Sequence, residues 1–470
     1  MLTRHALPLT VLLLALQPAL AESLKPISLH PDNPHYLLFR GKPTILITSG
    51  EHYGAVLNSG FDYVAYLKEL KANGFNLTRT FSGVYREVPG SFGIVENTLG
   101  PDAKDFICPW SKNDQGKYDL RAHNKAYFER LKNFIQKAGE QGIVVELVLF
   151  CAIYDDKLWD VNPMNPKNNI NELEKVGRLE VYTLKDKSLT EIQVELVRTI
   201  ATALKDFDNV YFEVCNEPYF GGVTPEWTDR MVEAITDTEK DLPARHLIAQ
   251  NIANGSSKVE KLNKNVSILN FHYATPPATV AQNHQLNRPI ADDETGFRGK
   301  DDLPYRSEAW EFLLAGGAIY SNLDYSFSAS RPDGTLKVTS SPGGGGRELR
   351  KQLRILKEFM EGFDFVRMKP LNSVVKGGSI TAPLSGDPPQ AKCTVRVLVD
   401  TGKAYALYIL GGTKAELVID LPAGSYKAEW LDTKTGRVSE EAKFEHAGGD
   451  RTLASPKYAE DIAPRIRKHP

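Results

Sequence analysis

The chain has 470 residues, of which 41% are hydrophobic and 25% are charged, and its formal net charge is −2. These values are ordinary for a globular protein with a full core, and the length favours two domains. Lysine and arginine are scattered along the chain, so nothing indicates binding to nucleic acid or to an anionic membrane surface.

The N-terminus has the pattern of a secretory signal. A short basic start precedes an apolar run over 6–16 and the small residues Ala19-Leu20-Ala21, where a signal peptidase would cut. The run is too short to span a bilayer as a helix. We predict a signal peptide over 1–21, cleavage after Ala21, and a secreted or periplasmic protein without membrane insertion. A buried N-terminal helix is the alternative.

From 22 to 368 the pattern alternates between strands and helices. A β-hairpin is expected over 27–39, around a cluster of turn formers. Nearly continuous apolar runs, typical of buried parallel strands, predict eight strands at 44–48, 75–81, 143–150, 210–214, 247–250, 267–272, 289–292 and 318–323. Helical spacing occurs at 62–73, 121–141, 188–205, 226–241, 303–315 and 347–362, and more weakly near 256–262 and 277–286.

This alternation predicts an α/β fold in which 22–368 form a (β/α)8 TIM barrel. A doubly wound open sheet is the alternative, although no G-x-G-x-x-G follows the first strand. Long insertions over 82–120 and 151–187 follow the second and third strands. Loops after barrel strands form the active face, so we expect aromatic residues there, Tyr154 and Trp159 among them, to contact a substrate. Trp159 is a candidate stacking platform for sugar, and packing in the core of the loop is its alternative.

After the barrel, short β-forming runs separated by turns predict a small all-β sandwich over 369–460. The tail over 461–470, rich in lysine, arginine and proline, is expected to fray. Four cysteines are scattered along the chain without metal-binding spacing. Cys108 and Cys151 are the first candidates for a disulfide, and buried reduced thiols are the alternative.

Two carboxylates follow strands on opposite sides of the predicted barrel. The fourth strand ends in Asn216-Glu217-Pro218, where the proline stops the strand and leaves Glu217 at the mouth. The seventh strand leads through Asp292 and Asp293 to Glu294-Thr295-Gly296. Glycosidic cleavage needs such a facing pair, and a separation of about 5–5.5 Å gives retention of configuration. Asp292 and Asp293 are rival candidates for the second carboxylate.

These two motifs resemble those of clan A glycoside hydrolases, especially the cellulase-like proteins around family 5. The resemblance covers about residues 40–365, and a small β-sandwich also follows the barrel in such proteins. It implies that Glu217 is the acid/base, that Glu294 is the nucleophile and that Asn216 binds the 2-hydroxyl of the sugar.

The resemblance extends less tightly to other positions. It implies that Arg79 keeps the nucleophile ionised and that His272 and Tyr273 orient it and contact sugar. The family commonly has a tryptophan after the eighth strand as a sugar platform, but this chain has none there, and Tyr325 or Phe327 is expected to replace it. His52, at the end of the first strand, is expected to contact substrate.

The two carboxyl groups need different electrostatic settings. A general acid needs a raised pKa, whereas a nucleophile must stay ionised. We therefore predict that Arg79 lowers the pKa of Glu294 and that the charge of Glu294 raises the pKa of Glu217.

The sequence thus predicts a retaining glycoside hydrolase that acts on a β-linked oligo- or polysaccharide, as a monomer and without cofactor or metal. A non-catalytic carbohydrate-binding protein on the same barrel is the main alternative. A metal-dependent hydrolase is the third, although Glu51-His52-Tyr53 offers a single histidine after the first strand where such sites usually have several.

Overall fold

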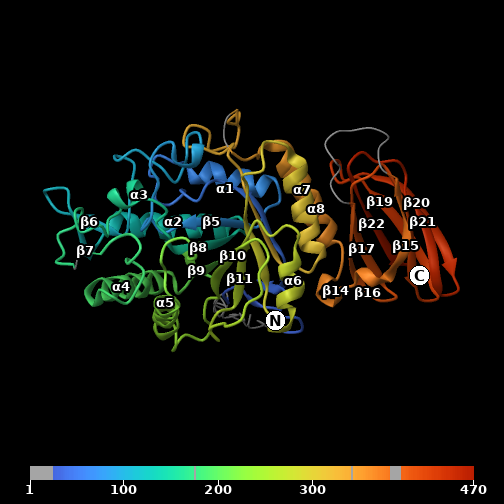
Figure 1. Cartoon of the computed structure of the whole chain (residues 1–470), viewed down its shortest axis with the longest axis horizontal. Coiled ribbons are helices and arrows are strands. Elements are labelled where there is room, and N and C mark those ends of the chain that lie inside the picture. Colours follow the sequence, from blue (N-terminus) through green and yellow to red (C-terminus); the bar gives the residue numbers. More distant parts are fainter. Residues whose placement is uncertain (1–24, 174–175, 340–341, 382–392, 470) are drawn as a thin grey trace, which may run out of the picture.

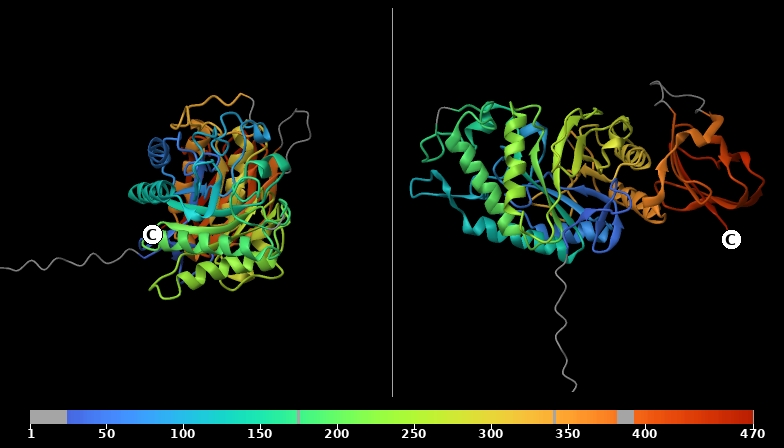
Figure 2. Two further views of the ribbon diagram at one scale, coloured as in Figure 1. Left: turned by 90° about the vertical axis from the view of Figure 1, so that its left-hand side faces the viewer. Right: turned by 90° about the horizontal axis from the view of Figure 1, so that it is seen from below.

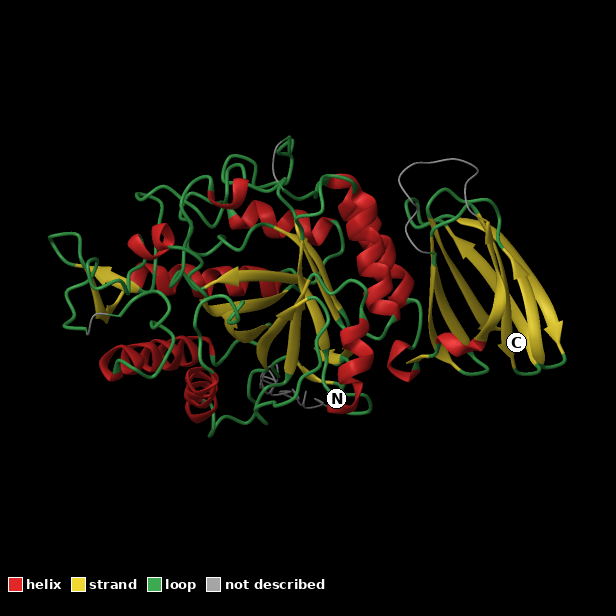
Figure 3. Cartoon of the chain, in the orientation of Figure 1, coloured by secondary structure: helices red, strands yellow, loops and turns green. Residues whose placement is uncertain are grey.

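The computed structural model describes residues 25–173, 176–339, 342–381 and 393–469. The predicted signal peptide over 1–21 lies outside them. Two units lie side by side, a barrel of strands and helices and an all-β unit (Figures 1 and 3). Within these ranges, no helix combines the length and the apolar character that crossing a membrane requires.

The barrel is one eight-stranded parallel sheet, which confirms the predicted fold class. Its strands are β4 (Leu46–Gly50), β5 (Leu77–Phe81), β8 (Val144–Cys151), β9 (Val210–Asn216), β10 (Ile248–Asn254), β11 (Ile268–His272), β12 (Ile290–Thr295) and β13 (Ile319–Leu323). The order in the sheet, β4-β13-β12-β11-β10-β9-β8-β5, is chain order around a ring. Apolar residues dominate these strands because both faces are covered.

A side chain closes the ring between β4 and β5. The backbone N–H of Ile47 donates to Oδ1 of Asn76 at 3.0 Å, and Nδ2 of Asn76 donates to the carbonyl of Ile45 at 2.8 Å. The amide of Asn76 therefore takes the place of ladder hydrogen bonds at the seam, where β4 and β5 share no regular pairing.

Helices cover the outside of the barrel. They are α1 (Tyr63–Ala72), α2 (Lys125–Glu140), α4 (Lys187–Leu204), α5 (Pro225–Thr238), α6 (Ala278–Asn283), α7 (Asp302–Leu314) and α8 (Arg347–Glu361). Side chains cap several of them; in α2, for example, Asn124 accepts hydrogen bonds from the backbone N–H groups of Ala126 and Tyr127.

The weak helix predicted near 256–262 is wrong, because β10 is followed by irregular backbone. The side chain of Asn283 in α6 holds this segment in place of helical hydrogen bonds. It accepts from the N–H of Val259 at 2.8 Å and donates to the carbonyl of Ser257 at 2.8 Å.

Smaller elements surround the barrel. The predicted N-terminal hairpin is present as β1 (Ser28–Leu29) and β2 (Leu37–Phe39), and β3 (Lys42–Thr44) extends it. The long insertion after β5 carries β6 (Trp110–Lys112), which pairs with β7 (Tyr118–His123), and the insertion after β8 carries α3 (Asp156–Asp160).

The C-terminal unit consists of two antiparallel sheets. One has the order β14-β16-β17-β22-β19-β20 and the other the order β15-β18-β21. The strands are β14 (Lys369–Pro370), β15 (Val375–Thr381), β16 (Thr394–Asp400), β17 (Ala404–Leu410), β18 (Lys414–Leu421), β19 (Gly424–Leu431), β20 (Val438–His446), β21 (Gly449–Ala454) and β22 (Asp461–Lys468).

The predicted fraying tail over 461–470 is wrong. Residues 461–468 form β22, which lies between β17 and β19 and pairs with both. Ile462 and Ile466 are buried in the core of the sandwich. Ala463 and Pro464 interrupt the alternation of apolar and polar residues, so the sequence of this strand lacks a clear period-two pattern.

The sandwich packs against α7, which stands between it and the barrel strands (Figures 1 and 2). The guanidinium of Arg306 in α7 binds both carboxylate oxygens of Asp461 in β22, each at 2.9 Å. The rings of Trp310 and Tyr408 stack beside this pair, with centroids 5.4 Å apart. The two units therefore share a hydrophobic core, and the sandwich supports the barrel from one side.

All four cysteines lie in the described ranges and carry free thiols, Cys108, Cys151 and Cys215 buried and Cys393 exposed. The candidate disulfide between Cys108 and Cys151 is therefore not formed, in agreement with the alternative of buried thiols.

Candidate active site

A pocket of about 480 Å³ lies at the carboxyl ends of the barrel strands. Glu217, directly after β9, and Glu294, near the end of β12, both line it. The other lining residues are His52, Tyr53, Phe81, Tyr85, Glu87, Phe92, Leu99, Cys151, Tyr154, Asn216, Phe220, Asn254, Tyr273, Gly296, Phe297 and Arg298. The pocket thus has the place expected for the active face of the barrel.

Several lining residues have a left-handed backbone where the chain leaves a strand. The φ angles are +59° at Tyr53, +45° at Glu217, +53° at Tyr273 and +57° at Phe297. Non-glycine residues adopt this conformation rarely, at a cost of about 1–3 kcal/mol each. The surrounding fold maintains four such residues at the strand ends that border one pocket, which marks this edge of the barrel as the functional one.

Glu294 is held from two sides. The hydroxyl of Tyr273 donates to its Oε1 at 2.6 Å, and Nη1 of Arg79 donates to its Oε2 at 3.3 Å. Arg79 therefore points to the mouth of the barrel, as predicted. A tyrosine hydroxyl and a guanidinium fix this carboxylate in one orientation.

Glu217 has a different set of partners. The hydroxyl of Tyr154 donates to its Oε2 at 2.5 Å, and Nδ1 of His272 lies 3.3 Å from its Oε1. The same His272 nitrogen lies 3.7 Å from Oε1 of Glu294, between the two carboxyl groups. One ligand atom each of Glu217, His272 and Glu294 lies within 4.8 Å of the others, so the two carboxyl groups face each other across a short gap.

The predicted rise in the pKa of Glu217 is wrong. Burial raises this pKa, but the hydrogen bond and charge of His272 and the hydrogen bond from Tyr154 outweigh it, so the pKa lies below its usual value. No local pattern in the sequence predicts that a histidine from β11 lies against the carboxyl group after β9.

An ionic layer lies inside the barrel, directly beneath the pocket. Nη2 of Arg79 lies 2.9 Å from Glu213, and its Nε lies 3.2 Å from Asp293 and 3.8 Å from Glu146. Nδ2 of Asn270, which has two hydrogens to donate, lies 2.6–2.9 Å from an oxygen of each of the three carboxyl groups. All five side chains are buried, although barrel interiors are usually apolar.

These three carboxyl groups are not equivalent. Burial and the charge of Glu213 raise the pKa of Glu146 to about 8. Burial also holds the pKa of Asp293 well above its usual value. For Glu213 burial acts in the same direction, but the charge of Arg79 outweighs it and the pKa is lowered. Burial thus favours the protonated form of Glu146 and Asp293, whereas Arg79 favours the ionised form of Glu213.

The rival carboxylates do not reach the pocket. Asp293 is bound in the ionic layer, and Asp292 accepts a hydrogen bond from the N–H of Ala274 at 3.2 Å and is fully buried. Register shifts between β12 and its two neighbours re-aim the side chains at its end. Of the three consecutive acids, Glu294 is the one that lines the pocket.

The structure brings most of the predicted binding residues together. His52, Tyr154, Asn216 and Tyr273 line the pocket. The ring of Tyr325 lies 5.8 Å from that of His52, and its hydroxyl is buried without a hydrogen-bond partner.

The exception is Trp159, whose prediction as a stacking platform is wrong. It lies in α3 and is 9% exposed, packed in the hydrophobic core of the protein. Aromatic composition alone could not distinguish a loop core from a sugar platform.

Sequence reasoning missed part of the pocket wall. Phe220 and Phe297 are exposed at the pocket, 52% and 43% respectively, and each follows a pocket glutamate, Glu217 or Glu294, by three residues. Phe92, 46% exposed, comes from the insertion after β5. The proximity of Phe220 and Phe297 to the motifs was an available signal. No comparable sequence signal pointed to Glu87, because a single acidic residue in a long loop is not distinctive.

Two groups of acids have the proximity that a metal site requires. They are Glu217 with His272 and Glu294, and Glu146 with Glu213 and Asp293. In the second group the nitrogen atoms of Arg79 and Asn270 already bind the carboxyl oxygens. The first group offers one imidazole and two carboxyl groups, and tyrosine hydroxyls donate to both carboxyl groups.

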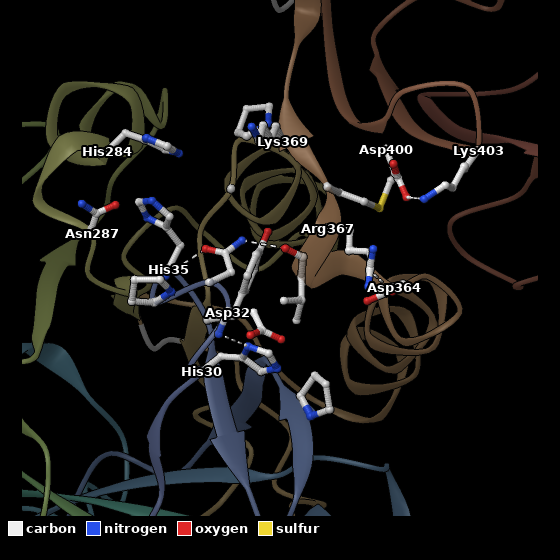
Figure 4. Close-up of a pocket in the computed structure, with 18 residues that line it drawn as sticks. His30, Asp32, His35, His284, Asn287, Asp364, Arg367, Lys369, Asp400 and Lys403 are labelled. Atoms are coloured by element: carbon white, nitrogen blue, oxygen red, sulfur yellow. Dashed lines mark hydrogen bonds and ion pairs between the residues drawn. The ribbon is translucent and has the colours of Figure 1, made fainter.

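A larger cavity of about 770 Å³ lies between the N-terminal hairpin, the lower end of the barrel and the sandwich (Figure 4). Two ion pairs border it, Arg367 with Asp364 at 3.1 Å and Lys403 with Asp400 at 3.5 Å. The rings of His35 and His284 stack at 4.0 Å. This cavity is at the far end of the barrel from the two facing carboxyl groups, and we do not assign the active site to it.

Comparison with known proteins agrees with this geometry. Residues 44–299 match the family described as cellulase, glycosyl hydrolase family 5. A glycoside hydrolase family 5 structure from Bacteroides vulgatus superposes with a TM-score of 0.62 at 14% identity, over 94% of this chain and 93% of the other. Another structure, described as a glycoside hydrolase, has a TM-score of 0.62 at 14% identity, over 94% and 97%. No curated protein sequence matches the chain.

Proposed function

Because the chain belongs to the cellulase family of glycosyl hydrolases, family 5, we propose that it cleaves a β-linked oligo- or polysaccharide with net retention of configuration. Glu294 is the nucleophile and Glu217 the acid/base. The observation that carries the proposal is the gap between these groups, whose nearest ligand oxygens lie within 4.8 Å. Retaining enzymes have carboxyl groups about 5–5.5 Å apart, whereas inverting enzymes need about 6.5–9.5 Å to admit a water molecule.

In the first step, Glu294 attacks the anomeric carbon and forms a glycosyl ester. The bond from this carbon to the leaving oxygen breaks, and the proton of Glu217 passes to that oxygen. In the second step, Glu217 takes a proton from water, whose oxygen attacks the anomeric carbon and releases Glu294. Arg79 and Tyr273 hold Glu294 throughout, and Asn216 is placed to bind the 2-hydroxyl of the sugar.

Glu217 must hold a proton when the first step begins, although its pKa is lowered in the free site. A sugar in the pocket removes water from this carboxyl group, and loss of solvation favours the neutral form. Once Glu294 is esterified, it no longer competes for His272. Substrate binding therefore favours the protonated form of Glu217 that the first step needs.

The test compares Glu217→Ala and Glu294→Ala on aryl β-glycosides and β-linked polysaccharides. Each change is expected to lower kcat by at least 10²–10⁴-fold, the range for a positioned acid or base. Azide separates the two roles. In the Glu294 variant it replaces the nucleophile and gives an α-glycosyl azide, whereas in the Glu217 variant it attacks the glycosyl ester and gives the β-glycosyl azide. Wild-type turnover in either variant refutes the assignment.

We also propose that the protein is exported and loses residues 1–21. The basic start, the apolar run and the Ala19-Leu20-Ala21 site support this proposal. Mass spectrometry of the protein recovered from the periplasm or medium is expected to find a chain that begins at Glu22. An intact N-terminus in the cytoplasmic fraction contradicts it.

A further inference from the structure

One carboxylate in the pocket has no part in the two-step reaction. Glu87 lies in the insertion after β5, is 3% exposed and lines the pocket. The hydroxyl of Tyr85 donates to its Oε1 at 3.3 Å, Nε2 of His52 lies 3.4 Å from the same oxygen, and the amide of Asn97 donates to its Oε2. A carboxylate offers about four lone-pair sites on two oxygens, so with three partners Glu87 can accept about one further hydrogen bond from a ligand.

Unpartnered polar atoms lie beside Glu87. Nδ1 of His52 and the hydroxyls of Tyr53 and Tyr325 are buried and have no hydrogen-bond partner. The His52 ring stacks on that of Tyr53 at 5.3 Å and lies 5.8 Å from that of Tyr325. Buried polar groups in native proteins nearly always have partners. Of the three residues, His52 and Tyr53 line the pocket, so their unpartnered polar atoms indicate a ligand that presents hydroxyls.

His52 also links Glu87 to the reaction centre. Burial lowers the pKa of His52, but the charge and hydrogen bond of Glu87, together with the charge of Glu294, outweigh burial and raise it. His52 thus lies within the field of both carboxylates. His52, Glu87 and Glu294 line the same pocket, so a sugar whose anomeric carbon faces Glu294 lies in the space that His52 and Glu87 border.

The wall that carries these groups is rigid. The carboxylate of Glu51 accepts hydrogen bonds from the N–H groups of Gly54 and Ala55 at 2.9 and 3.0 Å and from the hydroxyl of Thr98 at 2.5 Å. These bonds join the end of β4 to the insertion that holds Glu87. A Cβ on Gly54 would lie 2.1 Å from the carbonyl oxygen of Thr98, so the two segments are in direct contact.

We propose that Glu87, with His52, is the specificity-determining pair for the sugar that Glu294 attacks, and that it selects a neutral sugar over an acidic one. The inference rests on the proposed function. Three carboxylates, Glu87, Glu217 and Glu294, line one small pocket. Arg298 is the only arginine or lysine among its described lining residues, and its guanidinium lies 3.5 Å from Glu308. A uronic acid would bring a fourth carboxylate into this space, whereas hydroxyls satisfy the groups already there.

The test measures kcat/KM on 4-nitrophenyl β-glycosides of neutral sugars (glucose, galactose, mannose and xylose) and on 4-nitrophenyl β-D-glucuronide. Wild type is expected to prefer at least one neutral substrate by about a hundredfold. Glu87→Gln is expected to lower kcat/KM on that substrate by about ten- to a hundredfold, the range for hydrogen bonds to a charged group. Glu87→Gln should also lower the ratio of kcat/KM on the neutral substrate to kcat/KM on the glucuronide, because the negative charge of Glu87 no longer repels the carboxylate of the glucuronide.

Asp114→Asn is the matched control, since it makes the same chemical change at an exposed turn of the same insertion. It is expected to leave both rates and their ratio unchanged. His52→Gln provides a second variant, which should lower turnover of the neutral substrate even if Glu87→Gln fails to fold.

The test distinguishes an error in the proposed function from an error in the inference about Glu87. If wild type turns over none of the neutral glycosides or β-linked polysaccharides, the proposed function is wrong. If wild type is active but Glu87→Gln keeps its rate and its neutral-to-acidic ratio, or if wild type turns over the glucuronide equally well, the inference about Glu87 alone is overturned.

Discussion

Replacing Glu146 with glutamine tests the protonation of the ionic layer beneath the active site. Glu146 lies in β8, is fully buried, and accepts a hydrogen bond from Asn270 at 2.6 Å. Its pKa is raised from 4.5 to about 8 by burial and by the charge of Glu213. Glutamine keeps an acceptor for Asn270 and is neutral at every pH.

The raised pKa has a definite consequence for stability. Between pH 4.5 and about 8 the folded protein holds a proton on Glu146 that the unfolded chain has released. The contribution to stability is therefore greatest at the acid end and is lost at about 1.4 kcal/mol per pH unit as pH rises through this window. Over the whole window the loss is on the order of 5 kcal/mol. The Glu146→Gln variant has no titratable group at this position, so its stability does not fall in this way as pH rises.

Urea unfolding of both proteins at 25 °C, at half-unit steps from pH 5 to 7.5, measures the difference. The free energy of unfolding of Glu146→Gln should rise relative to wild type by about 1.4 kcal/mol per pH unit. Glu129→Gln is the control, because this side chain is 63% exposed on α2, and its difference from wild type should not vary with pH. A constant difference for Glu146→Gln as well would refute the reasoning and show that the folded protein carries Glu146 ionised.

Four further outcomes are expected. Tyr154→Phe removes a donor that lowers the pKa of Glu217, so the basic limb of the kcat/KM profile should move to higher pH; an unmoved limb contradicts this contact. Arg306→Ala leaves the carboxylate of Asp461 buried and unpaired and should destabilise by about 3–5 kcal/mol in urea unfolding. The joint change of Arg306→Met and Asp461→Asn should recover most of that loss. Trp159→Ala should destabilise by about 3–5 kcal/mol without raising KM, and a raised KM at unchanged stability would restore Trp159 to the substrate site. Dialysis against a chelator should leave turnover unchanged, whereas a loss reversed by a divalent cation contradicts the two-carboxylate mechanism.

The barrel was predictable because its signals are local. Each buried parallel strand is an apolar run, each covering helix repeats its apolar residues at helical spacing, and the chain alternates between them. The two motifs, Asn216-Glu217-Pro218 and Glu294-Thr295-Gly296, were visible for the same reason, since each follows its strand directly in the chain. Where the local pattern was weak, as at 256–262 and at β22, the prediction was wrong.

The sequence by itself determined the kind of fold, the order of its strands and the two glutamates that stand at opposite edges of the barrel mouth. The tertiary structure alone decided what surrounds them: that His272 lowers the pKa of Glu217, that Arg79 is shared among buried acids, and that Glu87 faces the pocket while Trp159 does not. These properties depend on distances between residues far apart in the chain. Coulombic and hydrogen-bond energies change over a few ångströms, and no local pattern encodes such distances.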